Sequence, residues 1–322
     1  MTRMRSKTAA VFATGLVLLA TGCAGEGSDG GDGGGAAAGE ITVGVLPLSD
    51  FAPVYWAQDH GTFKDQGLTV KFEPVQGGPV GVQEVVTGEL QFTNSTPIAS
   101  VIATAGGAPV QTVAMVSGFG EGELGVFAKA ASGIEEMADL DRKTVGINTT
   151  SDVGDVIFAH VAQAKGIDPK PDWVEVPFAE MIDGVKNGSI AARYLPEPFG
   201  TAAVDAGLRR VVNLVEGEDV GMPMSTFIAS TQYASSHPET VQSFAHALNA
   251  ARDDIAAHPD EFKKWLSGAI DSKPEEVEKM HLPVFDVVLD PKDIQNAADL
   301  LAGLGIIGPG YDAAKFTVVN EK

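Results

Sequence analysis

Hydroxyl and amide side chains gather at three places where an apolar, strand-like run gives way to a helical pattern. These places are residues 48–55, 94–96 and 148–152, and the side chains are Ser49, Asn94, Ser95, Thr149, Thr150 and Ser151. At the end of a strand, such groups and the free N–H groups of the next helix favour a ligand with negative charge or an oxygen acceptor. The pattern predicts a ligand-binding site. Thr150, Ser151, Asn94 and Ser95 are also suited to capping a helix, and this alternative stays open.

Aromatic residues stand near the same places and are suited to stacking on a flat ring at little entropic cost. The candidates are Phe51, Tyr55, Phe119 and Phe178, all of which we expect in loops. Trp56, by contrast, lies at helical spacing, and we expect it to be packed in the core. The aromatic residues therefore indicate a ligand with a flat, unsaturated ring.

Charge near these places is mainly negative. The acidic residues are Glu121, Glu123, Asp152, Asp155 and Glu197, and Arg193 is the one cation in the binding segments. A bare anion would need donors that outweigh this negative charge, so the pattern favours a neutral or amine-bearing heterocycle, pyrimidine-like, with Glu197 among its contacts. The alternative is that these carboxylates are solvated surface charges, the commoner case in an acidic chain.

Motifs for catalysis, metals and dinucleotides are weak in this sequence. Residues 120–125 match GxGxxG, but the strand-like LGVFAKA follows instead of a helix, so we interpret the motif as a glycine-rich turn near a hinge. The six histidines never fall in a tight ligand spacing, and no GxSxG is present. We expect no metal, no cofactor and no catalytic residue.

The first residues have the layout of a secretory signal, with a basic start at Arg3, Arg5 and Lys7 and an uncharged apolar run over residues 9–20. The run is short for a membrane-spanning helix, which needs roughly 20 apolar residues. Residues 19–23 resemble the lipobox of bacterial lipoproteins, which implies a signal peptide over residues 1–22 and lipidation of Cys23. The alternative is a plain secreted protein whose cysteine is accidental. Residues 24–39 are rich in glycine and poor in apolar residues, so we expect residues 23–39 to form a flexible, lipidated tether.

The composition limits the partners of the chain. The formal net charge is −21 at pH 7, and loss of residues 1–22 would remove three further positive charges. So acidic a protein is a poor partner for nucleic acid or anionic lipid. Cys23 is the only cysteine, so once it is lipidated no disulfide or thiolate nucleophile remains.

Strand-like runs alternate with helical patterns from residue 40 onward. The expected strands are residues 41–48, 68–75, 90–95, 110–117, 143–148, 172–178, 190–196 and 224–230. Among the helices, residues 96–106 are clearest, because Thr96 can cap, Pro97 suits the first turn and Gly106 ends the pattern. The alternation predicts an α/β fold with mainly parallel sheets covered by helices.

After residue 230 the pattern is helical to the end. We expect capping boxes from Ser236 to Glu239 and from Ser272 to Glu275, and a further cap at Asp290. This order fits two independent domains in series. It fits equally well a chain that visits one lobe, crosses to a second and returns, and periodicity leaves both open.

Four stretches, residues 53–72, 88–114, 132–155 and 177–199, occur in an order that resembles the solute-binding proteins of ABC importers for nitrate, sulfonates, taurine and thiamine-precursor pyrimidines. The resemblance implies a type II periplasmic-binding fold, with two α/β lobes around an interdomain cleft. Lobe one would combine residues 40–128 with 222–322, and lobe two would be residues 129–221. One departure is residues 190–194, IAARY, where many relatives carry an aspartate, and this puts the family's usual contacts near Arg193 in doubt.

The resemblance implies an extracytoplasmic monomer, lipid-anchored to the outer face of the membrane, that captures a small organic solute by hinge closure and delivers it to a permease. A sulfonate, taurine or nitrate ligand is the alternative within the family. Outside that class stand a sensor without transport and a pyrimidine synthase of the same family. The synthase uses a cysteine-rich motif, which this chain lacks. We therefore expect a binding protein and not an enzyme.

Overall fold

The structure is a computed structural model that describes residues 40–270 and 272–318. The predicted signal peptide (residues 1–22), the predicted tether (residues 23–39) and the lipidation predicted at Cys23 lie outside the described residues. Within the described ranges, none of the helices combines the length and the apolar character needed to cross a membrane.

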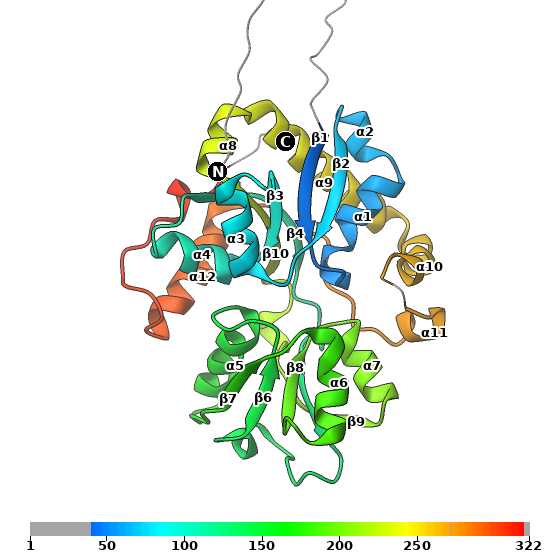
Figure 1. The fold of residues 1–322 in the computed structure, drawn as a ribbon, viewed down its shortest axis with the longest axis vertical. Helices are drawn as coiled ribbons and strands as arrows, with labels where there is room; N and C mark the ends of the chain where they lie inside the picture. Colours follow the sequence, from blue (N-terminus) through cyan, green and yellow to red (C-terminus); the bar gives the residue numbers. More distant parts are fainter. Residues whose placement is uncertain (1–39, 271, 319–322) are drawn as a thin grey trace, which may run out of the picture. The chain divides into compact units, whose positions relative to one another are not determined.

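The described residues form two five-stranded sheets, which we call A and B (Figure 1). Sheet A has the order β2-β1-β3-β10-β4, in which β1 runs parallel to β2 and β3, and β10 runs antiparallel to β3 and β4. Its strands are β1 (Glu40–Val45), β2 (Thr69–Pro74), β3 (Phe92–Ser95), β4 (Val110–Gly118) and β10 (Pro223–Ser230).

Sheet B repeats the same scheme. Its order is β7-β6-β8-β5-β9, with β6 parallel to β7 and β8, and β5 antiparallel to β8 and β9. Its strands are β5 (Gly125–Lys129), β6 (Thr144–Ile147), β7 (Asp172–Glu175), β8 (Ala192–Leu195) and β9 (Leu208–Asn213). We call the part built on sheet A lobe one and the part built on sheet B lobe two, so the expected fold of two α/β lobes is confirmed.

The helices follow the strands in alternation and then form a helical tail. Before β10 they are α1 (Ala52–Asp59), α2 (Thr62–Asp65), α3 (Gly78–Thr87), α4 (Pro97–Ala105), α5 (Val153–Ala164), α6 (Phe178–Asn187) and α7 (Phe199–Asp205). After β10 they are α8 (Thr231–Ser236), α9 (Pro238–Ala257), α10 (Pro259–Ala269), α11 (Pro274–Val277) and α12 (Pro291–Gly303). Helix α9 packs on α1, α2 and β4, and α12 packs on α4, so the tail returns to lobe one.

The core of lobe one holds stacked aromatic rings. Phe92 lies 4.1 Å from Phe244 of α9, centroid to centroid, with nearly parallel planes. Trp56 is 1% exposed and donates to Asp254 Oδ2 at 2.8 Å, which confirms that it is core packing. The tail is therefore tied to the α1 region by both apolar and polar contacts.

Of the predicted helix caps, two are confirmed and two are wrong. Thr96 Oγ1 accepts from the Ala99 N–H at 2.9 Å, and Asp290 accepts from the Lys292 N–H at 2.8 Å, as expected. The predicted capping boxes at Ser236 and Ser272 are wrong by one residue. Each of these two helices begins with a proline, so the residue directly before it, His237 or Lys273, occupies the N-cap position.

The chain crosses between the sheets twice, from β4 to β5 and from β9 to β10. The first crossing lies before Gly125, because β5 already pairs in sheet B, whereas the sequence placed this boundary at residue 128. The tail runs beside the crossings, since Gly118 and Val284 exchange backbone hydrogen bonds of 2.7 and 3.0 Å. A Cβ at Gly120 would lie 2.0 Å from the Leu282 carbonyl oxygen, so only glycine fits this close approach.

Candidate functional site

A cleft of about 440 Å³, part of it open to solvent, lies where the two lobes meet. Its walls come from the segments that follow β1 and β3 in lobe one and β6 and β8 in lobe two, together with the starts of α3, α5 and α6. These are carboxyl ends of parallel strands and helix N-termini, the positions where ligands bind in α/β proteins. Only about 40 Å³ of it is internal space that a water molecule can occupy, so a solute enters only when the lobes move apart.

The lobe one wall begins with a short helical turn, Ser49–Phe51, directly after β1. Asp50 is 1% exposed and its Oδ2 accepts from the Ser225 hydroxyl of β10. Asn94 and Ser95, at the end of β3, are also buried and line the same cleft. Two strand ends of sheet A thus place a carboxylate, an amide and a hydroxyl on one wall.

The lobe two wall is organised by Asp152, the N-cap of α5. Its Oδ1 accepts from the Val153 N–H at 2.8 Å, and Asp155 Oδ1 accepts from the Asp152 N–H at 3.0 Å. Helix α5 therefore begins directly after Asp152, and neither Thr150 nor Ser151 is its N-cap. Thr150 instead donates from its N–H and its hydroxyl to Glu175 Oε1, at 2.8 and 2.7 Å.

Two hydrogen bonds join the lobes across the cleft. The Thr96 hydroxyl donates to Asp152 Oδ1 at 2.7 Å, and the Ser49 hydroxyl donates to the Glu197 carbonyl oxygen at 3.3 Å. Both bonds link loops that line or border the cleft, so its geometry depends on the contact between the lobes.

The structure brings four of the predicted site residues into the cleft wall, namely Phe51, Asn94, Ser95 and Phe178. Ser49 borders the wall through its bond to Glu197. Phe51 lies in the short helical turn, and Tyr55 and Phe178 lie in α1 and α6, so the expectation that all three occupy loops is wrong. Phe178 still reaches the cleft because it is the first residue of its helix.

The other predicted residues lie elsewhere. Tyr55 packs edge-on against Phe72, with ring centroids 5.1 Å apart. Phe119 lines a separate hollow beside Met222 and Asp293, and Ser151 borders a groove between α3 and α4. Thr149 packs on Gly77, and Thr150 is held by Glu175.

Sequence reasoning did not select Asp50, Asn148, Asp152 or Tyr194 as contacts, although all four line the cleft. Asp50 offered a signal, since it is a lone carboxylate between two selected residues, Ser49 and Phe51. No such signal pointed to Tyr194. The face of β8 that lines the cleft follows only from how the two lobes meet.

Burial dominates the electrostatics of the cleft. It raises the pKa of Asp50 to about 6, although the Ser225 hydroxyl opposes the shift, and it raises the pKa of Asp152 to about 6 against the Thr96 hydroxyl. Burial, followed by the negative charges of Asp152 and Asp50, also holds the pKa of Tyr194 well above its ordinary value. Tyr194 is therefore a neutral phenol at physiological pH.

Arg193, the one cation of the predicted binding segments, does not line the cleft. Its neighbour Tyr194 does, and successive residues of a strand point to opposite faces. Arg193 is fully buried, its guanidinium has no hydrogen-bond partner among the described residues, and burial lowers its pKa to about 10. Its guanidinium is therefore not part of the cleft surface.

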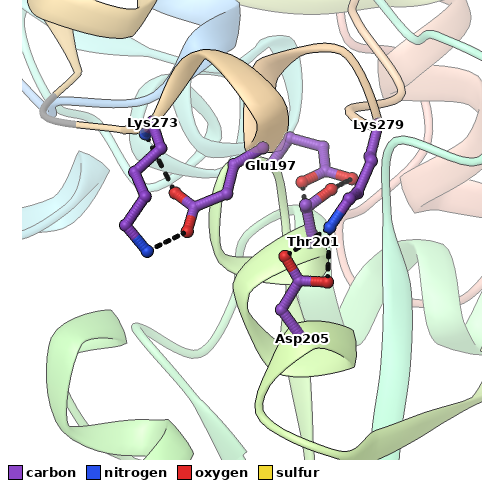
Figure 2. Close-up of polar contacts among 6 residues, drawn as sticks. Glu197, Thr201, Asp205, Lys273 and Lys279 are labelled. Carbon is purple, nitrogen blue, oxygen red and sulfur yellow. Dashed lines mark hydrogen bonds and ion pairs between the residues drawn. The ribbon is translucent and has the colours of Figure 1, made fainter.

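Glu197 is buried, and it lies beside Thr201 in the first turn of α7 (Figure 2). Its carboxylate accepts from the Thr201 N–H at 2.9 Å and the Thr201 hydroxyl at 3.0 Å, and Arg210 lies 3.9 Å away. Beside it, Lys279 of the tail donates to both oxygens of Asp205 in α7 at 2.8 Å. These contacts tie the tail of lobe one to lobe two.

No group of three or more His, Cys, Asp and Glu side chains within residues 40–270 and 272–318 is arranged to hold a metal ion.

Comparison with known proteins gives one family. The family described as "NMT1/THI5 like" matches residues 48–262. The chain is 26% identical to the taurine-binding periplasmic protein of Escherichia coli (strain K12) over 250 residues, which cover 74% of this chain and 72% of that protein. It is 27% identical to the 4-amino-5-hydroxymethyl-2-methylpyrimidine phosphate synthase THI13 of Saccharomyces cerevisiae over 245 residues, which cover 71% of this chain and 69% of that protein.

Among solved structures, the fold is similar to that of the alkanesulfonate-binding protein SsuA of Xanthomonas axonopodis pv. citri, bound to MOPS. The TM-score is 0.74 at 17% identity, and the match covers 88% of this chain and 99% of that one. The likeness confirms the periplasmic-binding fold.

Proposed function

Because the chain belongs to the NMT1/THI5-like family, we propose that it is an extracytoplasmic solute-binding lipoprotein of an ABC importer. In this proposal Cys23 carries the lipid, and residues 23–39 tether the folded part to the outer face of the cell membrane. The folded part acts as a monomer that captures a small organic solute and delivers it to a membrane permease. The taurine-binding relative and the SsuA fold support this role.

One observation carries the proposal, namely a cleft whose walls come from both lobes. A solute that touches the Asp50 and Asn94 wall and the Asp152 wall at once makes all its contacts only when the lobes are together. Its binding therefore favours the closed arrangement, which the Thr96 to Asp152 hydrogen bond also holds. The closed arrangement is the form that would dock on the permease.

The preferred ligand is a pyrimidine-like heterocycle. Phe178 and Tyr194 lie with ring centroids 6.3 Å apart, and both line the cleft together with Phe51. Aromatic faces suit a flat ring, and the amides of Asn94 and Asn148 suit the donors and acceptors at its edge. No chemistry on the ligand is part of this proposal, although the yeast relative named above is a synthase.

A sulfonate, taurine or nitrate ligand is the second candidate. The names of the taurine-binding and alkanesulfonate-binding relatives favour it. The N-terminus of α3 at Gly78 and that of α5 at Val153 both reach the cleft, and helix N-termini attract anions. The two carboxylates in the walls oppose this candidate.

A thermal-shift screen of the purified chain tests the binding role and separates the two candidates. The compounds are aminopyrimidines, thiamine, riboflavin, taurine, alkanesulfonates and nitrate. A ligand at 100 times its Kd stabilises the folded state by about 2.7 kcal/mol, which is a shift of several degrees. Aminopyrimidines should give that shift, a shift with sulfonates alone would favour the second candidate, and no shift with any compound would contradict a solute-binding role of this kind.

A further inference from the structure

A groove lies in lobe one between α9 and the segment 285–289 that follows α11, and residues 113–115 of β4 also line it. About 450 Å³ of this groove is space that a water molecule can occupy, against about 40 Å³ in the cleft. A solute can therefore enter the groove without any movement of the lobes. None of the described residues that line the groove also lines the cleft, so the two are separate places on the molecule.

Arg252 of α9 brings a buried positive charge to this groove. The residue is 5% exposed, and its Nη2 donates to the side-chain oxygen of Asn249, one turn earlier in the helix. Its Nε is buried without a hydrogen-bond partner in residues 40–270 and 272–318, and no carboxylate in those ranges forms an ion pair with it. A buried charge without a counter-ion is destabilising, so an anion that enters the groove would stabilise this guanidinium.

Two aspartates beside Arg252 limit the charge of that anion. Burial lowers the pKa of Arg252, and the negative charges of Asp253 and Asp286 oppose this shift. Both aspartates line the groove and are exposed, and neither forms an ion pair with the guanidinium. They repel a ligand in proportion to its negative charge. A singly charged carboxylate, whose planar shape fits the guanidinium fork, is therefore favoured over a dicarboxylate or a phosphate group.

The lining opposite α9 is mainly apolar. It is formed by Phe285, Val287, Val288 and Leu289. The Phe285 ring is held edge-on against Phe262 of α10, with ring centroids 5.2 Å apart, whereas Val288 is 51% exposed. An apolar group in the groove would remove such surface from water, which is favourable. The groove therefore suits a ligand that joins one negative charge to an apolar body.

We propose that this groove is a second ligand-binding site of the protein, and that it takes a monocarboxylate with an apolar body, such as a short-chain fatty acid. The carboxylate accepts from the Arg252 guanidinium, and the apolar body lies along Phe285, Val287 and Val288. The site is formed by lobe one alone. Binding there is independent of the solute proposed for the cleft and does not rest on the proposed function.

The test uses three small probes, hexanoate, hexanamide and adipate, with amide NMR titrations of the purified chain at pH 7.5. Hexanoate should shift the resonances of groove residues such as Ala245 and Val287, and it should bind about tenfold more tightly than neutral hexanamide. Adipate should bind more weakly than hexanoate, because its second carboxylate meets Asp253 and Asp286. Equal affinities for hexanoate and hexanamide, or no binding of hexanoate at millimolar concentration, would overturn the inference.

Variants assign the preference to Arg252. Arg252→Met keeps a long unbranched side chain without the charge, so hexanoate should bind about tenfold more weakly and lose its preference over hexanamide. Arg142→Met removes an equal charge from a side chain that is 88% exposed, and as the matched control it should change neither value. Asp286→Asn changes an exposed residue and should strengthen hexanoate binding about two- to fivefold, which keeps the test valid if Arg252→Met does not fold. Unchanged hexanoate affinity in Asp286→Asn and in a folded Arg252→Met would overturn the assignment.

A competition experiment separates the groove from the cleft. A compound that the thermal-shift screen identifies should bind with unchanged affinity when hexanoate is present and in the Arg252→Met variant. Hexanoate that displaces this compound, or that shifts the resonances of the cleft residues Asn94 and Phe178 instead of those of the groove, would overturn the inference. The titrations with hexanoate give their result whether or not the screen finds a solute for the cleft, so failure of one proposal is distinguishable from failure of the other.

Discussion

The cleft and the start of α7 each hold a buried carboxylate, Asp50 and Glu197, and the two have different surroundings. Glu197, beside the start of α7, accepts two hydrogen bonds from Thr201 and faces Arg210. Asp50, in the cleft, accepts one bond from Ser225, and its other oxygen is unpaired within the part of the chain that the structure describes. The two carboxylates are therefore alike in burial and differ in how many of their oxygens are paired.

The largest change in stability, a loss, is expected from Glu197→Ala. This change removes the acceptors of Thr201 at the start of α7 and leaves the Arg210 guanidinium, which is 21% exposed, without its counter-ion. Breaking such a pair should lower the free energy of unfolding by about 3–4 kcal/mol, measured by urea denaturation. Glu197→Gln, which keeps an acceptor for Thr201, is the matched variant and should lose less than half as much. Equal losses in both variants would show that the hydrogen bonds to Thr201 contribute little.

A gain in stability is expected from Asp50→Asn in the ligand-free protein. The pKa of Asp50 is raised from 3.8 to about 6, so the folded state binds this proton more tightly than the unfolded state does. The free energy of unfolding should therefore fall as the pH rises from about 4 to about 6, by roughly 3 kcal/mol from this group. The variant should be about 2–3 kcal/mol more stable than the parent at pH 7.5 and no more stable at pH 4.

Urea denaturation of both chains at several pH values measures the stability gain of Asp50→Asn. A stability difference between variant and parent that stays constant from pH 4 to pH 7.5 would refute the raised pKa. A variant that is less stable at pH 7.5 would mean that Asp50 is a structural group like Glu197.

The smallest effect is expected from Lys279→Met, which removes the ion pair between the tail and α7 seen in Figure 2. The two side chains are 54% and 37% exposed, and exposed ion pairs contribute at most about 1 kcal/mol. The unfolding free energy should change by less than 1 kcal/mol, and the change should shrink further in high salt. Lys315→Met, which removes a pair within the tail itself, is the control. A loss above 2 kcal/mol would place Lys279 with Glu197 as a structural contact.

The fold was largely predictable, because its local signals agree with its tertiary structure. The alternation of strands and helices and the Thr96 and Asp290 caps all appear where the sequence placed them. The sequence analysis placed the first crossing too late. Residues Gly125 to Lys129 have a strand pattern, but the pattern does not indicate which of the two sheets the strand joins. Strand β9 was not predicted, and two capping boxes were wrong by one residue because proline fixed the helix start.

The cleft was predictable only in part. Strand ends located Asn94 and Ser95, and the residues close to such ends indicated the acidic, aromatic character. Tyr55 and Thr150 were selected because they stand close in sequence to such ends, yet one packs on Phe72 and the other is held by Glu175. Which side chains face the cleft depends on the rotation of each helix and on how the lobes meet. The spacing of residues along the sequence determines neither.

Strand β10 lies between β3 and β4 in sheet A, although the whole of lobe two separates it from them along the chain. Lobe two is continuous in sequence and can pair all its strands early, whereas β3 and β4 must wait for a strand that arrives after residue 222. Contacts of such long sequence separation form slowly. Until they form, the facing edges of β3 and β4 keep unpaired N–H and C=O groups, which other chains can also pair with. We therefore expect lobe two to complete its sheet before lobe one does, because of the place of this one strand.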